Sequence, residues 1–226
     1  MARRKRKGGG PATFLIIAFI LGTILGAVAS STVLQGRGSL LLSSGEVHTR
    51  SIAVVGISDG VGKLATLTVE LRPGSGHLGI AVPPYEDQEA QASAVVARTA
   101  AETTTGHKLD RVDILISFDN LPERTTVTGP SSSASIALLL LATINASLGR
   151  SPNMVRQDVV VSASINEIGR LEPVGNILEK YRAVVEDGSY AVFVVSRDQT
   201  FDSGSLAKVS VEKAVDLNEL AEIVLR

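Results

Sequence analysis

An uncharged apolar stretch near the N-terminus, Thr13–Ser31, restricts what this chain can fold into more than any other feature of the sequence. No charged residue follows it until Arg37, and a cluster of five cationic residues, Arg3–Lys7, precedes it. A run of about 20 such residues is long enough to cross the hydrocarbon core of a bilayer as a helix. Because the run has no polar face, a buried helix of a soluble domain is the weaker interpretation. We therefore predict a basic tail at residues 1–12 and a membrane segment at residues 13–32.

Two fates of this segment are compatible with its residues. It is either a retained single-pass anchor or a signal peptide that is removed after the small residues Ala27, Val28 and Ala29. In both cases the positive flank stays in the cytoplasm and everything after Thr32 lies outside, anchored in the cell membrane or secreted. Gly22 and Gly26 have the spacing that lets helices pair in lipid, so the anchor allows a homo-oligomer.

The rest of the chain is acidic and contains no cysteine. Removal of the basic tail leaves 17 basic against 23 acidic residues. Such a domain lacks the positive surface that attracts nucleic acid, so we expect no nucleic-acid partner. The absence of cysteine excludes thiol catalysis, cysteine-based zinc sites and disulfides.

From Glu46 onward the sequence alternates between strand and helix patterns. Residues 33–45 are rich in Gly and Ser and are predicted to be a linker. Asp59-Gly60 predicts a hairpin turn between two β-branched segments. The predicted strands are 48–56, 63–71, 112–118, 158–165 and 191–196, and the predicted helices are 88–105, 134–148, 175–186 and 211–225. The helix at 134–148 is almost wholly apolar and is expected to be buried. This mixture predicts a single α+β domain at residues 46–226.

Several familiar catalytic patterns are absent. There is no G-x-S-x-G nucleophile elbow and no H-E-x-x-H metal motif, and none of His48, His77 and His107 lies in a catalytic motif, although a Ser-His-Asp triad could still assemble in space. Gly56–Lys63 resembles a phosphate-binding loop, but its spacing is wrong by one and Leu64 replaces the required Ser or Thr. We therefore expect no metal, cofactor or nucleotide.

The segment Thr128–Ala137, TGPSSSASIA, opens the apolar helix. Hydroxyl residues at a helix start usually cap it, but three consecutive serines exceed what capping requires. A helix N-terminus points backbone N–H groups and the positive end of its dipole at that place, where a developing oxyanion is stabilised. A serine there needs a base, and without histidine a lysine of lowered pKa is the usual alternative.

Lys180 is the strongest candidate for that base. It follows a turn-rich segment, GRLEPVG at 169–175, and lies between apolar Ile177 and Tyr181 on a predicted helix. There it either points inward, where desolvation lowers its pKa, or is an ordinary exposed helix lysine.

Together the two segments resemble the proteolytic domain of the Lon proteases, especially the archaeal ones. In that family a motif of the form G-x-S-A-[GS]-[IV] carries the nucleophile, and Ser133-Ala134-Ser135-Ile136 matches its core. A second family block, T-G-x-[IV]-x-x-x-G-x-[VL]-x-P-[IV]-G-G-x-x-x-K, aligns without gaps on Ser162–Lys180. The resemblance implies that Ser133 is the nucleophile, that Lys180 is the general base, and that Ser162, in place of the block's threonine, hydrogen-bonds the lysine amine.

The chain departs from the family pattern in places. Ser131, Ala163 and Asn176 stand where the family has glycine, and the loop at 149–157 is about four residues longer than in the bacterial enzymes. The resemblance covers residues 46–226, and the ATPase module of Lon has no counterpart in this sequence.

The resemblance implies a Lon-type α+β fold and an ATP-independent, membrane-anchored serine endopeptidase. Its expected substrates are unfolded or extended polypeptides outside the membrane. Two alternatives stay open: a catalytically inactive, membrane-anchored peptide-binding module of the same fold, and a protease that cuts only its own linker.

Overall fold

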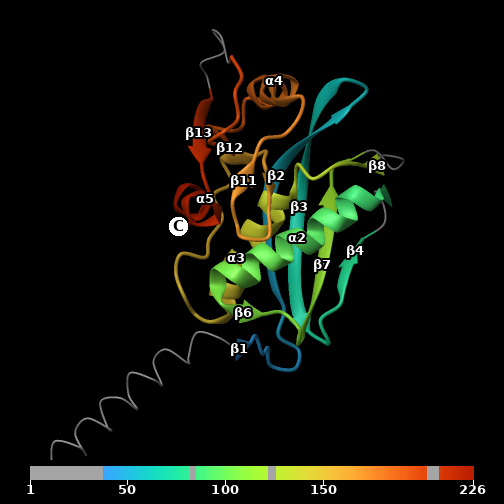
Figure 1. Ribbon diagram of the computed structural model, residues 1–226, viewed down its shortest axis with the longest axis vertical. Helices are drawn as coiled ribbons and strands as arrows, with labels where there is room; N and C mark the ends of the chain where they lie inside the picture. Colours follow the sequence, from blue (N-terminus) through green and yellow to red (C-terminus); the bar gives the residue numbers. More distant parts are fainter. Residues whose placement is uncertain (1–37, 82–84, 122–125, 203–208) are drawn as a thin grey trace, which may run out of the picture. The chain divides into compact units, whose positions relative to one another are not determined.

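The computed structural model describes residues 38–81, 85–121, 126–202 and 209–226 (Figure 1). The predicted tail at 1–12 and membrane segment at 13–32 lie outside these residues. Among the helices that are described, none combines the length and apolarity needed to cross a membrane. Residues 39–226 form one folded unit of mixed helices and strands, as the sequence predicts for an α+β domain.

A seven-stranded mixed sheet runs through this unit (Figure 1). Two long strands, β2 (His48–Ser58) and β3 (Val61–Pro73), form an antiparallel hairpin in its centre. On the β3 side follow β7 (Val112–Asp119), antiparallel to β3, and β4 (Leu78–Ile80), parallel to β7. On the β2 side three parallel strands follow in the order β9 (Val159–Val161), β12 (Val192–Ser196) and β13 (Ser210–Ala214).

The remaining elements are four helices and three short strand pairs, within the described residues. The helices are α2 (Gln88–Thr105), α3 (Ser133–Ser147), α4 (Ile177–Asp187) and α5 (Leu217–Val224). The short strands pair as β1 (Gly38–Ser39) with β6 (His107–Lys108), β5 (Tyr85–Glu86) with β8 (Thr126–Val127), and β10 (Ser164–Ile165) with β11 (Leu171–Glu172).

Helices cover both faces of the sheet, and successive residues of a strand serve opposite faces. On β9, Val159 and Val161 pack into the larger core with α2, α3 and α5, whereas Val160 packs into a second core with α4. On β12, Val194 and Phe193 divide between the two cores in the same way. Strands that are buried on both sides read as continuous apolar runs, which explains the sequence VVV in β9.

The hairpin forms where the sequence predicts it. Asp59 (φ 52°) and Gly60 (φ 76°) both adopt left-handed backbone between β2 and β3. A two-residue hairpin turn with positive φ at both positions matches the right-handed twist of the strands, and Asp-Gly is a preferred sequence for it.

Two predicted elements differ from the structure. The predicted strand 158–165 is two strands, β9 and β10, separated by Ser162 and Ala163. The predicted helix 211–225 is a strand followed by a helix: β13 pairs in parallel with β12, and Asp216 then caps α5 by accepting hydrogen bonds from the N–H groups of Asn218 and Glu219. The apolar residues in SVEKAVDL fit both the 3.6-residue period of a helix and the two-residue period of a strand. The strand forms because residues 210–214 hydrogen-bond to the edge of β12.

The folded unit also begins earlier than the predicted domain start at Glu46. Leu40, within the predicted linker at 33–45, is only 2% exposed and belongs to the larger core. Its N–H donates to the Lys108 carbonyl, so this part of the linker is attached to the domain.

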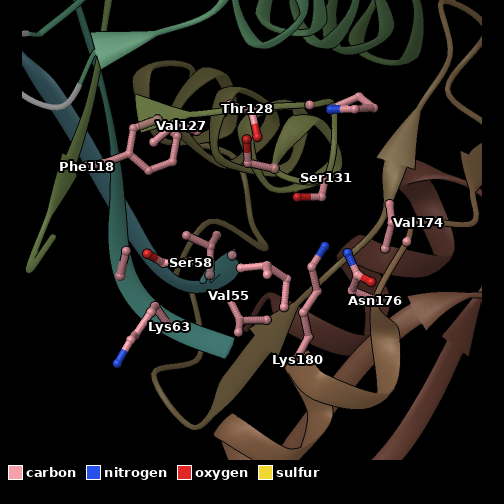
Figure 2. A pocket seen from close by; sticks show the side chains of 18 of the residues that line it. Val55, Ser58, Lys63, Phe118, Val127, Thr128, Ser131, Val174, Asn176 and Lys180 are labelled. Atoms are coloured by element: carbon pink, nitrogen blue, oxygen red, sulfur yellow. The ribbon is translucent and has the colours of Figure 1, made fainter. Parts of the chain in front are cut away.

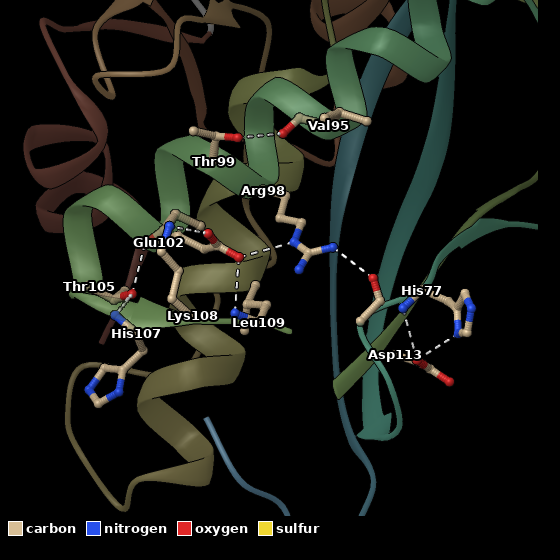
Figure 3. A network of polar contacts seen from close by, with 12 residues as sticks. His77, Val95, Arg98, Thr99, Glu102, Thr105, His107, Lys108, Leu109 and Asp113 are labelled. Atoms are coloured by element: carbon tan, nitrogen blue, oxygen red, sulfur yellow. Dashed lines mark hydrogen bonds and ion pairs between the residues drawn. The ribbon is translucent and has the colours of Figure 1, made fainter. Parts of the chain in front are cut away.

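A polar network fastens the end of α2 to the sheet (Figure 3). The Glu102 carboxylate accepts hydrogen bonds from Arg98, Lys108 and the N–H of Leu109. Burial would raise the pKa of Glu102, but these hydrogen bonds outweigh it and leave the pKa below its usual value. Arg98 donates in turn to the Gly76 carbonyl in the connection between β3 and β4. The network thereby attaches α2 to the connection between β3 and β4, at the edge of the sheet.

Helix α4 approaches β3 so closely that the strand has no side chain at the contact. A Cβ atom on Gly62 would lie 2.6 Å from the Ala183 Cβ and 2.6 Å from the Glu179 carbonyl oxygen. Two backbone segments at this separation leave room for hydrogen only, so Gly62 sets the distance between α4 and the hairpin.

Gly62→Ala tests this contact. The added methyl group must push α4 away from β3, so we expect the free energy of unfolding to fall by about 1–3 kcal/mol in urea denaturation. Gly56→Ala, on the neighbouring strand, is the matched control, because a Cβ there meets nothing within 4 Å and should leave the stability nearly unchanged. Equal stability of the two variants would contradict the close-packing argument.

Candidate active site

A cavity of about 370 Å³ lies at one end of the central hairpin. Its walls come from β2 and β3, from the loop that leads into α3, and from the turn before α4 (Figure 2). Most of the lining is apolar, with Val54, Val55, Ile57, Phe118, Val127 and Val174 as the larger side chains. The polar groups include Lys180, Asn176 and the serines at 131 and 132. A concave apolar site with a few polar groups is the usual form of a ligand-binding or catalytic pocket.

Lys180 belongs to this cavity and is nevertheless almost fully buried. It lies on the first turns of α4, where Ile177 and Tyr181 pack into the second core, and it is only 4% exposed. Figure 2 shows its amine extending into the cavity on the side where Ser131 lies. Among the described residues, no side chain or carbonyl is hydrogen-bonded or ion-paired to the amine. Burial lowers the pKa of Lys180 to about 8. A substantial fraction of this lysine is therefore neutral at mildly alkaline pH.

Ser131 and Ser132 line the cavity with Lys180, whereas Ser133 is not one of the lining residues. Ser133 is the first residue of α3 and is 1% exposed. Its hydroxyl donates to the Pro130 carbonyl (2.7 Å) and accepts a hydrogen bond from the N–H of Ile165 (3.1 Å). In this conformation the Ser133 hydroxyl bonds to main-chain groups and not to Lys180. The role of Ser133 as nucleophile stays a prediction.

The segment 162–165 is attached to the start of α3 by main-chain hydrogen bonds. Besides the bond from Ile165 to Ser133, the N–H of Ala134 donates to the Ala163 carbonyl. The structure thus joins the two segments that carry the sequence motifs, which are far apart in the chain.

Ser162, the predicted partner of the Lys180 amine, is 1% exposed and its hydroxyl has no hydrogen-bond partner among the described residues. The Ser135 hydroxyl on α3 is in the same situation. A buried hydroxyl without a partner costs about 1–3 kcal/mol of stability, so each of these groups needs a reason to be there. The hydrogen bond from Ser162 to Lys180 stays a prediction.

A Ser-His-Asp group does assemble elsewhere, but not in the geometry of a catalytic triad. The Ser75 hydroxyl lies 2.9 Å and the Asp113 carboxylate 3.4 Å from His77, and both contact the same ring nitrogen, Nδ1. A triad places serine on one imidazole nitrogen and aspartate on the other. The His77 side chain is also 81% exposed, and Asp113 accepts N–H groups of the local turn. We interpret these three side chains as stabilising the turn between β3 and β4, with no catalytic role.

Ser132 and Asn176 line the cavity beside Lys180 but were not among the sequence-predicted site residues. Ser132 precedes the predicted nucleophile, and the run of three serines was the signal available in the sequence, which does not tell which of them line the cavity. Asn176 precedes α4 with φ 54° and ψ 36°, a left-handed conformation that is uncommon for a residue other than glycine. Its position in the glycine-rich turn was the signal available in the sequence.

The comparison with known proteins adds no relative to these observations: no protein-family model matches the chain, and no curated protein does. Among the described residues, no group of three or more His, Asp or Glu side chains is placed to hold a metal ion.

Lys180→Met tests the burial of the lysine apart from any activity. Because the folded state lowers the pKa from 10.5 to about 8, the unfolded chain binds the proton more tightly. Burying the charged amine therefore lowers the free energy of unfolding by its full amount below pH 8, and this destabilisation disappears as the pH rises toward 10.5. We expect Lys180→Met to raise the free energy of unfolding at pH 7 by up to about 3 kcal/mol, with the difference shrinking between pH 8 and 10.

The measurement is urea denaturation at a series of pH values. Lys63→Met is the matched control, since Lys63 borders the same cavity but is exposed. A Lys180→Met variant that is no more stable than the wild type at pH 7 would show that the lysine is not buried in this way.

Proposed function

We propose that the chain is an ATP-independent serine endopeptidase with a Lon-type proteolytic domain, in which Lys180 is the general base for Ser133. The observation that carries the proposal is the buried amine of Lys180, with a pKa of about 8, in a cavity that also borders the serine run at the start of α3. Burying a lysine without a counter-charge is unfavourable for stability, and perturbed ionisable groups in a cavity are typical of catalytic sites.

In the proposed reaction, the Ser133 oxygen attacks the carbonyl carbon of a peptide bond while neutral Lys180 takes the hydroxyl proton. The C–N bond then breaks, and Lys180 returns the proton to the leaving amine. Water, activated by the same lysine, hydrolyses the acyl-enzyme. Main-chain N–H groups at the start of α3 stabilise the oxyanion, for which those of Ser133 and Ala134 have to leave the carbonyls of Pro130 and Ala163. Ser162 orients the lysine amine.

For this attack the Ser133 hydroxyl has to turn from the Pro130 carbonyl toward the cavity. Ser132 is the alternative nucleophile, because it already lines the cavity and its side chain makes no capping hydrogen bond at the start of α3. The choice between the two leaves the reaction type and the base unchanged.

The apolar lining supports polypeptide substrates with apolar side chains near the cleaved bond. A cavity of about 370 Å³ has room for a side chain and adjoining main chain but not for a folded domain, which favours unfolded or extended segments. The proposal keeps residues 13–32 as a membrane anchor with the domain outside. An inactive binding module of the same fold would have no need for a buried, partly neutral lysine.

Single alanine variants of the serine run identify the nucleophile. We expect Ser133→Ala to abolish cleavage of casein by the purified full-length chain, and Ser131→Ala and Ser132→Ala to keep much of it, because loss of a nucleophile removes the covalent step. If Ser132→Ala is the inactive variant, the nucleophile is one residue earlier. Full activity in all three variants would show that the nucleophile is not in this serine run.

The pH dependence and Lys180→Arg test the base. Only the neutral lysine accepts a proton, so activity should rise with pH through a midpoint near 8. Lys180→Arg should be as inactive as Lys180→Ala, since a guanidinium does not lose its proton in a protein. Circular dichroism serves as the control for folding. A folded Lys180→Arg variant with wild-type cleavage rates would overturn the Ser–Lys mechanism.

A further inference from the structure

We propose that Asn176 is a substrate-binding residue of this site, whose side-chain carboxamide hydrogen-bonds the main chain of the bound polypeptide. The inference deepens the proposed function and depends on it for the identity of the ligand. It starts from the conformation of Asn176, from its free carboxamide, and from its place in the cavity beside Lys180.

The backbone of Asn176 is in an unfavourable conformation that its own side chain does nothing to support. Within the described residues, three residues other than glycine have positive φ: Asp59, Asn120 and Asn176. The side chains of the first two are hydrogen-bonded: Asp59 accepts from Ser58, and Asn120 donates to Thr66 on β3. Asn176 occupies the capping position of α4, yet its side chain makes no capping hydrogen bond. Its carboxamide is thus left available for a ligand.

The position of this carboxamide relative to Lys180 is fixed by α4. The carbonyl of Asn176 accepts a hydrogen bond from the N–H of Lys180 (3.1 Å), so the two residues are one helical turn apart. Residues at this spacing lie on the same side of a helix. Figure 2 shows the Asn176 carboxamide beside the Lys180 amine at the cavity. The two side chains therefore border the same part of the cavity.

The chemistry of the carboxamide matches that of a peptide unit. It offers a donor and an acceptor together, so it can donate to a main-chain carbonyl and accept from a main-chain N–H. The other polar side chains that line the cavity are hydroxyls and two lysines, and the amine of Lys63 points away from Lys180 (Figure 2). Asn176 is thus the one carboxamide among the lining residues. It recognises polypeptide main chain independently of sequence.

Asn176→Gly removes the carboxamide and leaves a residue that adopts φ 54° without strain. We expect the thermal midpoint to stay equal or rise. The KM for fluorescein-labelled casein should increase about three- to tenfold, the range that one lost hydrogen bond produces, with kcat within twofold of wild type. Asp59→Gly is the matched control: it relieves the same backbone strain in the hairpin turn, outside the cavity lining, and should leave KM unchanged.

A binding measurement separates this inference from the proposed reaction. In a Lys180→Ala background, which cannot cleave, Asn176→Gly should weaken binding of labelled casein in fluorescence anisotropy by the same three- to tenfold. If KM and Kd both stay within twofold of the parent, Asn176 does not contact the substrate and the inference is overturned. If the wild type cleaves nothing but Asn176→Gly weakens binding, the peptidase proposal fails and the binding role of Asn176 stands. Absence of both cleavage and binding overturns both.

Discussion

The arrangement of this domain depends on the need to bury helix α3 on every side. Its residues from Ser133 to Ile144 are all buried, and eight of its first ten are Ala, Ile or Leu. A helix without a polar face cannot lie on a surface, so β2 and β3 cover one side while α2 and α5 cover the other. The residues before the N-terminus of α3 lie at the end of the hairpin. This is where the serine run borders the cavity.

The sequence predicts those parts of the fold that are decided locally. The apolar helix, the Ala-rich helix α2 and the Asp59-Gly60 turn each depend on residues within one segment. The sequence does not predict that residues 210–214 form a strand, because that strand exists only through pairing with β12. For the site, the sequence predicts Ser133 and Lys180 as a pair, and the structure brings Lys180 to a cavity that Ser131 and Ser132 also line. Which serine hydroxyl points into the cavity depends on side-chain rotation and on the hydrogen bond from the N–H of Ile165 to Ser133. These two residues are 32 positions apart, so no local sequence pattern predicts the bond.

Burial of Lys180 has to be compensated by the packing around it. The next residue, Tyr181, is 1% exposed, contacts the rings of Phe193 and Phe201, and donates its hydroxyl hydrogen bond to the Val209 carbonyl. On the facing side, Gly62 lets α4 approach β3 without an intervening side chain. Burial of large aromatic side chains stabilises a fold by several kcal/mol, which exceeds the cost of lowering one lysine pKa to about 8. The aromatic cluster thus keeps the amine in the cavity wall.

The orientation of the Ser133 hydroxyl is compatible with the proposed reaction, as the magnitudes involved show. Turning it toward the cavity breaks its bond to the Pro130 carbonyl, and a hydrogen bond of this kind contributes about 0.5–1.5 kcal/mol. Enzymes lower activation barriers by about 8 kcal/mol or more, so such a rotation reduces the rate by about tenfold at most. The resting rotamer therefore does not decide between Ser132 and Ser133.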